Sequence, residues 1–309
     1  MSAPRPGLAE VAAVWALYGL VAVATTLTYA RVPVAELYHV SESGAQGGFG
    51  RALVFVNFPT ALAAVAVLPV ALDRLLATSR NRLLQGVFGA VAALAVVLCL
   101  TTAFPGVVDQ ADLDAKPVNA VPALGVAIAL ALTVLAVWRG GLGRPARGDG
   151  WDRWRALLAV VLAVASLPWI WAELGFYISG APLLGDVFLA AEPRPEPGDP
   201  GLRAVHLGRH HGFDGALLAV TAILLSRVIR DVRGGRLRRG LALAVAALLV
   251  YGLLNATQDF WLEQVVKRGS TDERLPSFLR PGLTWAWASM VAAAAAVYAF
   301  GTRRLERVR

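Results

Sequence analysis

The sequence is poor in charged residues and contains a single cysteine. Asp, Glu, Lys and Arg make up 16% of its 309 residues, whereas soluble globular domains carry about 25%. Cys99 has no second cysteine to pair with, which excludes a disulfide framework and a cysteine-based zinc site. This composition argues against a soluble enzyme, a secreted disulfide scaffold and a disordered tail.

Hydrophobic residues fill the chain instead, at 57% of the composition with a mean hydropathy of +0.59. They gather in runs of roughly 20 residues, each long enough to cross a hydrocarbon core about 30 Å thick. We therefore expect an all-α integral membrane protein that forms one polytopic domain over residues 1–309. Runs bounded by charge, Gly or Pro predict eight transmembrane helices, at about 11–30, 52–72, 83–104, 119–138, 156–175, 207–226, 241–258 and 283–301.

The charges that remain predict the orientation of these helices. The loops and ends on one side of the predicted helices carry 19 Lys and Arg and 6 acidic residues. Those on the other side carry 10 Lys and Arg and 15 acidic residues. Because short positively charged loops stay in the cytoplasm, both the N-terminus and the C-terminus are expected there, in a plasma-membrane protein. Tryptophans mark the two interfaces, with Trp138, Trp151 and Trp154 inside and Trp169, Trp171, Trp261, Trp285 and Trp287 outside.

One apolar stretch, residues 174–191, is broken by Gly, Pro and Asp. A ninth span there would move every later loop to the opposite side of the membrane and place the Arg-rich loop 227–239 outside. We therefore expect a re-entrant or interfacial segment. The next residues, 192–201, contain four prolines and predict an extended extracytoplasmic linker.

All four histidines fall on the predicted outer side. In the sixth span, His206, His210 and Asp214 are spaced at i, i+4 and i+8, which places them on one face of a helix. Ionisable groups at the membrane edge are costly and are functional candidates by default. Two imidazoles one turn apart can bind one metal ion. The predicted metal ligands are His206, His210, His211, Asp214, His39 and Glu36.

Other spans bring polar residues to the same side. The seventh span ends in Asn255, Asp259, Glu263 and Lys267, a stripe with a spacing of four residues. We predict catalytic roles for Glu173, Asp259 and Glu263, and substrate-binding roles for Arg51, Asn57, Arg203, Lys267 and Arg268. Each of these residues taken alone is also compatible with a solvated helix end or with contact to lipid headgroups.

Histidine together with carboxylate favours zinc, and makes iron or haem a weaker alternative. The sequence has no HExxH, GxSxG or P-loop motif, and no family is identified. The leading hypothesis is a metal-dependent hydrolase or group transferase that acts on a lipid or lipid-linked substrate among membrane lipids. A transporter or channel, or a metal- or haem-binding accessory protein, are the alternatives. No nucleic-acid partner is expected, because the arginines lie between the spans.

Overall fold

A computed structural model of the protein describes residues 7–31, 47–104, 116–176, 205, 210–279 and 281–307. Within these ranges the chain is helical and contains no strand. The all-α membrane fold predicted from the hydrophobic runs is confirmed, because six helices are long and apolar enough to cross a membrane. They are α1 (Ala9–Tyr29), the continuous helix Ala52–Thr78 within α2 to α3, α4 (Arg82–Leu100), α5 (Ala120–Gly140), α10 (Gly235–Trp261) and α11 (Trp285–Arg307).

The remaining two predicted spans differ from regular membrane-crossing helices. The fifth is a pair, α6 (Asp152–Ala165) and α7 (Leu167–Glu173), bent by 54°. The bend falls just before Pro168. A proline ring clashes with the preceding turn of a straight helix, and proline has no N–H to donate to that turn. The sixth is α9, which spans only His211–Ser226. The predicted helix started at residue 207, but His210, directly before α9, has extended backbone, so the predicted helix was too long. The structure thus supports six spans, or seven if the bent pair crosses as one.

Two helices contain a wider turn of the π type. The first, η2 (Val56–Thr60), joins α2 (Gly47–Phe55) to α3 (Ala61–Thr78) and contains Pro59. The second, η6 (Leu262–Val266), extends α10. There the backbone N–H of Lys267 donates to the carbonyl of Leu262, five residues earlier, at 2.8 Å. Turns of this kind are rare and occur frequently at functional sites.

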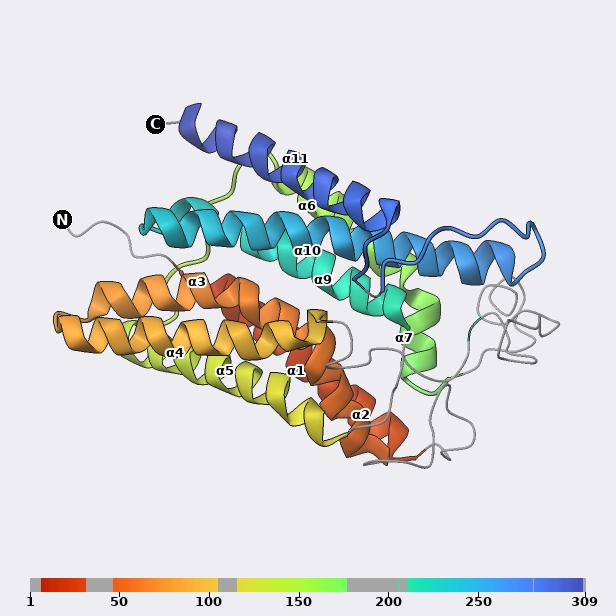
Figure 1. Ribbon diagram of the computed structural model, residues 1–309, viewed down its shortest axis with the longest axis horizontal. Coiled ribbons are helices and arrows are strands. Elements are labelled where there is room, and N and C mark those ends of the chain that lie inside the picture. The colour runs from red at the N-terminus through yellow and green to blue at the C-terminus, as the bar shows by residue number, and fades with distance from the viewer. Residues whose placement is uncertain are drawn as a thin grey trace.

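The bundle has α10 near its centre (Figure 1), and α10 packs most extensively against α9. Gly215 on α9 and Gly252 on α10 face each other in this contact. A Cβ atom on Gly252 would lie 2.5 Å from the carbonyl oxygen of Gly215, so only glycine permits this approach. Ala219 and Ala256 lie four residues further along, which gives both helices the small-xxx-small pattern of close membrane packing. The contact fixes the relative position of the two helices that carry the site described below.

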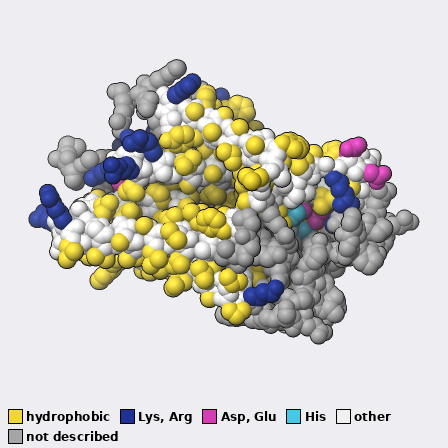
Figure 2. Space-filling view, viewed as in Figure 1, with side chains coloured by type: hydrophobic (Ala, Val, Ile, Leu, Met, Phe, Trp, Pro, Cys, Tyr) yellow, Lys and Arg dark blue, Asp and Glu magenta, His cyan; other side chains and the backbone are white. Residues whose placement is uncertain are grey.

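The outer surface of the helices is apolar. Leu20 and Leu27 on α1 are 68% and 60% exposed, and Val97 on α4 is 62% exposed. Hydrophobic side chains cover much of the face seen in Figure 2. Such a continuous apolar surface is the expected surface of a protein in a bilayer rather than in water.

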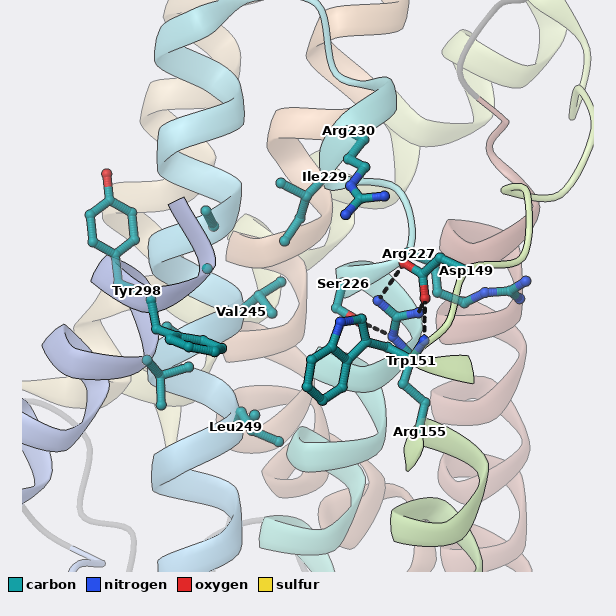
Figure 3. A pocket seen from close by; sticks show the side chains of 15 residues that line it. Asp149, Trp151, Arg155, Ser226, Arg227, Ile229, Arg230, Val245, Leu249 and Tyr298 are labelled. Atoms are coloured by element: carbon teal, nitrogen blue, oxygen red, sulfur yellow. Dashed lines mark hydrogen bonds and ion pairs between the residues drawn. The ribbon is translucent and has the colours of Figure 1, made fainter. Parts of the chain in front are cut away.

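Most of the Lys and Arg side chains seen in Figure 2 lie at one end of the bundle, whereas His and acidic side chains, with a few Lys or Arg beside them, appear toward the other. At the basic end, a pocket of about 250 Å³ lies between α6, α9, α10 and α11 (Figure 3). Arg155 there donates to Asp149 at 2.6 Å, to Asp152 at 2.8 Å and to the hydroxyl of Ser226 at 2.9 Å. These contacts connect the loop before α6 to the last turn of α9.

Candidate metal centre

Three buried side chains, His210, Asp259 and Glu263, converge where α9 begins and α10 ends. One ligand atom from each lies within 4.8 Å of the other two. They are 2%, 3% and 1% exposed, so solvent does not screen their charges. Nitrogen or oxygen donors of one tetrahedral zinc ion lie about 3.4 Å apart. The three ligand atoms would therefore draw together by up to about 1.4 Å to hold such an ion.

His210 lies immediately before α9, with φ −117° and ψ 123°, which is extended backbone. Its Nδ1 atom is 2.9 Å from Oε1 of Glu263, and its ring stacks on Trp169 with 25° between the planes. The prediction that His210 shares a helical face with His206 and Asp214 was therefore wrong for His210. Tertiary contacts to Trp169 and Glu263 hold this histidine outside the helix.

Glu263 belongs to the wide turn η6. Its second carboxylate oxygen, Oε2, accepts a hydrogen bond from Nε1 of Trp169 at 2.5 Å. Both oxygens of this buried carboxylate are thus fixed, one by an indole and one by an imidazole. Such supporting contacts orient a metal ligand and restrict its rotation.

Asp259 lies one turn before Glu263 on α10. Its Oδ2 atom accepts the backbone N–H of Gly212 at 2.8 Å, and its Oδ1 atom is 3.3 Å from Nε2 of His211. The same His211 nitrogen lies 2.7 Å from the amide oxygen of Gln258. The first turn of α9 therefore binds the end of α10 through backbone as well as side chain, and His211 supports Asp259.

Glu173, at the end of α7, brings a third carboxylate to this region. It is 7% exposed, its Oε2 lies 3.5 Å from the hydroxyl of Tyr29, and it interacts electrostatically with His210. Glu173 is therefore near the centre, although it is not one of the three convergent ligands.

The other predicted site residues are distributed as follows. Asp214 is buried in the first turn of α9, outside the group of three. Asn57 is 1% exposed in η2, and neither amide atom has a hydrogen-bond partner among the described residues. Lys267 is buried just after η6, and Arg268 donates to Gln264 at 3.0 Å. The backbone of Arg51 belongs to α2, whereas its side chain, and all of His206, His39, Glu36 and Arg203, lie outside the described residues.

Three residues of the centre were missed by the sequence reasoning. Trp169 was assigned to the interfacial belt, yet it is 1% exposed and contacts both His210 and Glu263. Gly212 and Gln258 carry no pattern that marks them before the helices are placed. The one usable signal was position, because Gly212 directly follows two histidines and Gln258 precedes Asp259.

The donor set fits a divalent ion, with one imidazole nitrogen and two carboxylates. Zinc accepts these ligand types, and a carboxylate majority also suits manganese or magnesium. Comparison of the chain with protein-family models, curated proteins and solved structures found no match. The fold and this centre define the class of protein: a multi-pass α-helical membrane protein with a buried His, Asp and Glu cluster.

Proposed function

We propose that the protein is a metal-dependent membrane enzyme, a hydrolase or group transferase, that acts on a lipid or lipid-linked substrate. The observation that carries the proposal is the convergence of His210, Asp259 and Glu263 at one end of an apolar bundle. Burying two carboxylates and an imidazole together costs free energy unless they are paired or bind a cation. If such a group served stability alone, apolar side chains of similar size in its place would often make the protein equally or more stable.

Zinc in this position would supply a Lewis acid that makes water nucleophilic near neutral pH. His210, Asp259 and Glu263 would hold the ion, while Trp169 fixes the rotamer of Glu263. Glu173 lies beside the group and is the best placed described carboxylate to accept a proton from water or return one to a leaving group. Lys267 and Arg268 follow the centre on the same helix end, where they suit a phosphate-bearing headgroup.

The proposed orientation places this centre on the extracytoplasmic face of the plasma membrane, with both termini in the cytoplasm. It is supported by the basic side chains that gather at the opposite end of the bundle. Reporter fusions at residues 79–81 and 271–275 test it. Residues 79–81 should be cytoplasmic and residues 271–275 external; the reverse result overturns the orientation.

The experiment that tests the function is elemental analysis of detergent-purified protein, wild type beside Glu263→Gln. Stoichiometric zinc, manganese or iron in the wild type, lost in the variant, is the expected result. Glu273→Gln is the matched control, because Glu273 is an exposed acid of the loop after η6. An absorption spectrum of the same samples detects haem. No metal in either protein overturns the metal site and leaves the His210 and Glu263 pair as a metal-free acid and base.

Transport is a second candidate, favoured by Asn57. Its buried amide has no hydrogen-bond partner among the described residues and lies in a π turn beside Pro59. Unwound or widened helix segments with free polar groups are typical of ion and substrate sites in transporters. Uptake of radiolabelled metal ions into proteoliposomes tests this candidate: Asn57→Leu should abolish transport, and equal uptake by protein-free vesicles would exclude it.

A further inference from the structure

A long apolar groove runs down the outside of the bundle from the candidate metal centre. It has a volume of about 410 Å³ and lies between α1, the bent pair α6 and α7, and α9. Ligand pockets of proteins commonly measure about 300–1,000 Å³. Leu20, which is 68% exposed, forms part of its wall, so the groove opens sideways to the surrounding bilayer.

The order of the lining residues gives the groove a direction. On α9 they run from Phe213 to Val220, which is a length of about 10 Å at 1.5 Å per residue. Phe213 is three residues from His210, and Glu173 lines the groove. The end near Phe213 and Glu173 therefore adjoins the candidate metal centre. This length along α9 corresponds to about two thirds of the thickness of one leaflet of a hydrocarbon core about 30 Å thick.

One polar group in the wall of this groove has no partner. Ser166, at the bend between α6 and α7, is 3% exposed, and its Oγ has no hydrogen-bond partner among the described residues. A buried hydroxyl left unpaired costs free energy. Rotation of this hydroxyl toward a carbonyl oxygen of a ligand in the groove would remove that cost, whereas a plain hydrocarbon offers it no acceptor.

We infer that the groove binds one acyl chain of a lipid, with the ester or amide carbonyl of that chain accepting a hydrogen bond from Ser166 and the headgroup at Glu173 and the metal centre. The inference rests on the proposed function and adds the substrate class, an acyl lipid that enters sideways between α1 and α9. The groove's apolar lining, its opening to the bilayer and its continuity with the centre all match that occupant.

Photolabelling tests the inference. The full protein in nanodiscs is irradiated with phosphatidylcholine whose acyl chain carries a diazirine, and labelled peptides are mapped by mass spectrometry. Labels should concentrate on the groove residues of α1 and α9. Ala24→Trp, which fills the groove from α1, should lower that labelling at least about five-fold. Ala131→Trp is the matched control on the exposed side of α5 and should leave it unchanged.

The role of Ser166 is tested with an ether-linked form of the same probe, which lacks the carbonyl. The wild type should prefer the ester probe by about five-fold, the value of one neutral hydrogen bond. Ser166→Ala should label equally with both probes. An equal response of the wild type to the two probes overturns the hydrogen bond.

Two further results overturn the inference. One is labelling spread evenly over all lipid-facing helices and unchanged by Ala24→Trp. The other is a groove filled by another segment of this chain, which would appear as crosslinks between groove cysteines and that segment. Metal content is measured in the same samples and should not change in Ala24→Trp. Confined labelling in a protein without metal would support the groove and overturn the metal-dependent enzyme, so the two failures are distinguishable.

Discussion

Trp169 and Glu263 are 94 positions apart in the chain, yet the indole Nε1 of Trp169 donates to Oε2 of Glu263 inside the bundle. The same indole ring stacks on His210. One side chain of α7 therefore contacts two of the three candidate ligands, which come from two other parts of the chain. We regard Trp169 as a positioning residue, because it touches the ligands and is not itself a metal donor.

Replacing Trp169 with Phe should keep most of the ring packing and remove the N–H. Supporting contacts of this kind change metal affinity by about 10–100-fold. When the metal-free proteins are titrated with zinc, Trp169→Phe should bind the metal with an affinity lower than that of the wild type by a factor in that range. The unfolding temperature of the metal-free variant should stay close to that of the metal-free wild type. Trp171→Phe, two residues away, is the control. Equal affinity in wild type and Trp169→Phe would show that the contact does not orient Glu263.

Gly212→Ala should disrupt the centre. A Cβ at this position would overlap the Trp169 ring and lie 2.7 Å from Cβ of Asp259. Both neighbours are buried, so the first turn of α9 must shift, and overpacking of this type costs about 1–3 kcal/mol. We expect lower metal affinity and a lower unfolding temperature. Gly86→Ala on α4 meets nothing within 4 Å and should retain both properties; similar losses there would point to a general effect of the substitution.

Gly252→Ala should weaken the packing of α9 against α10. Its Cβ would lie 2.5 Å from the Gly215 carbonyl oxygen and 2.8 Å from the Ala219 backbone nitrogen. Because backbone atoms cannot rotate away, we expect a loss of about 2 kcal/mol of unfolding free energy. Unfolding in mixed micelles with increasing SDS measures it. Gly89→Ala, with open space around it, should unfold as the wild type does.

Asp149→Asn should destabilise the protein in a pH-dependent way. Burial opposes ionisation of Asp149, but hydrogen bonds from Arg155 and from the backbone N–H of Trp151 outweigh it and lower the pKa of this carboxyl. A carboxyl with a lowered pKa in the folded state adds stability above its unfolded pKa, and that stability is lost as the pH falls through the folded pKa.

The variant should therefore be less stable than the wild type by about 1 kcal/mol at pH 7, and the difference should shrink below about pH 4. Thermal unfolding at several pH values measures this. Glu273→Gln, in an exposed loop, should show no such difference. A gap that is the same at every pH would mean that Asp149 acts through packing rather than charge.

The helices could be predicted from the sequence because their signal is local. A run of apolar residues about as long as the membrane is thick has few other stable conformations, and α1, α4 and α5 follow their runs closely. The start of α9 could not be predicted, since His210 is held outside the helix by Trp169 and Glu263, residues far away in the sequence.

The candidate site was predicted in part. His210 was among the expected metal ligands, and Asp259 and Glu263 were among the expected catalytic residues, because buried ionisable groups at a membrane edge are conspicuous in an apolar chain. The geometry was different, since one imidazole is joined by a carboxylate of α10 and a carboxylate of η6 instead of by a second imidazole close to it in the chain. Spacing along a single helix cannot reveal a contact between helices, and Trp169 has no sequence feature that separates it from an interfacial tryptophan.

The wide turn at Leu262–Val266 sets the direction in which the chain leaves the centre. Each step of four residues in a regular α-helix overshoots a full turn by about 40°, so the stripe from Asn255 to Lys267 would wind away from α9. The wide turn counteracts that winding, and Glu263 and Lys267 remain buried. A π turn contains one residue more than an α turn, so regular α-helical geometry over the same residues would rotate everything beyond them by about 100°. A substitution that straightened this turn would therefore redirect Lys267 even where all three ligands were kept.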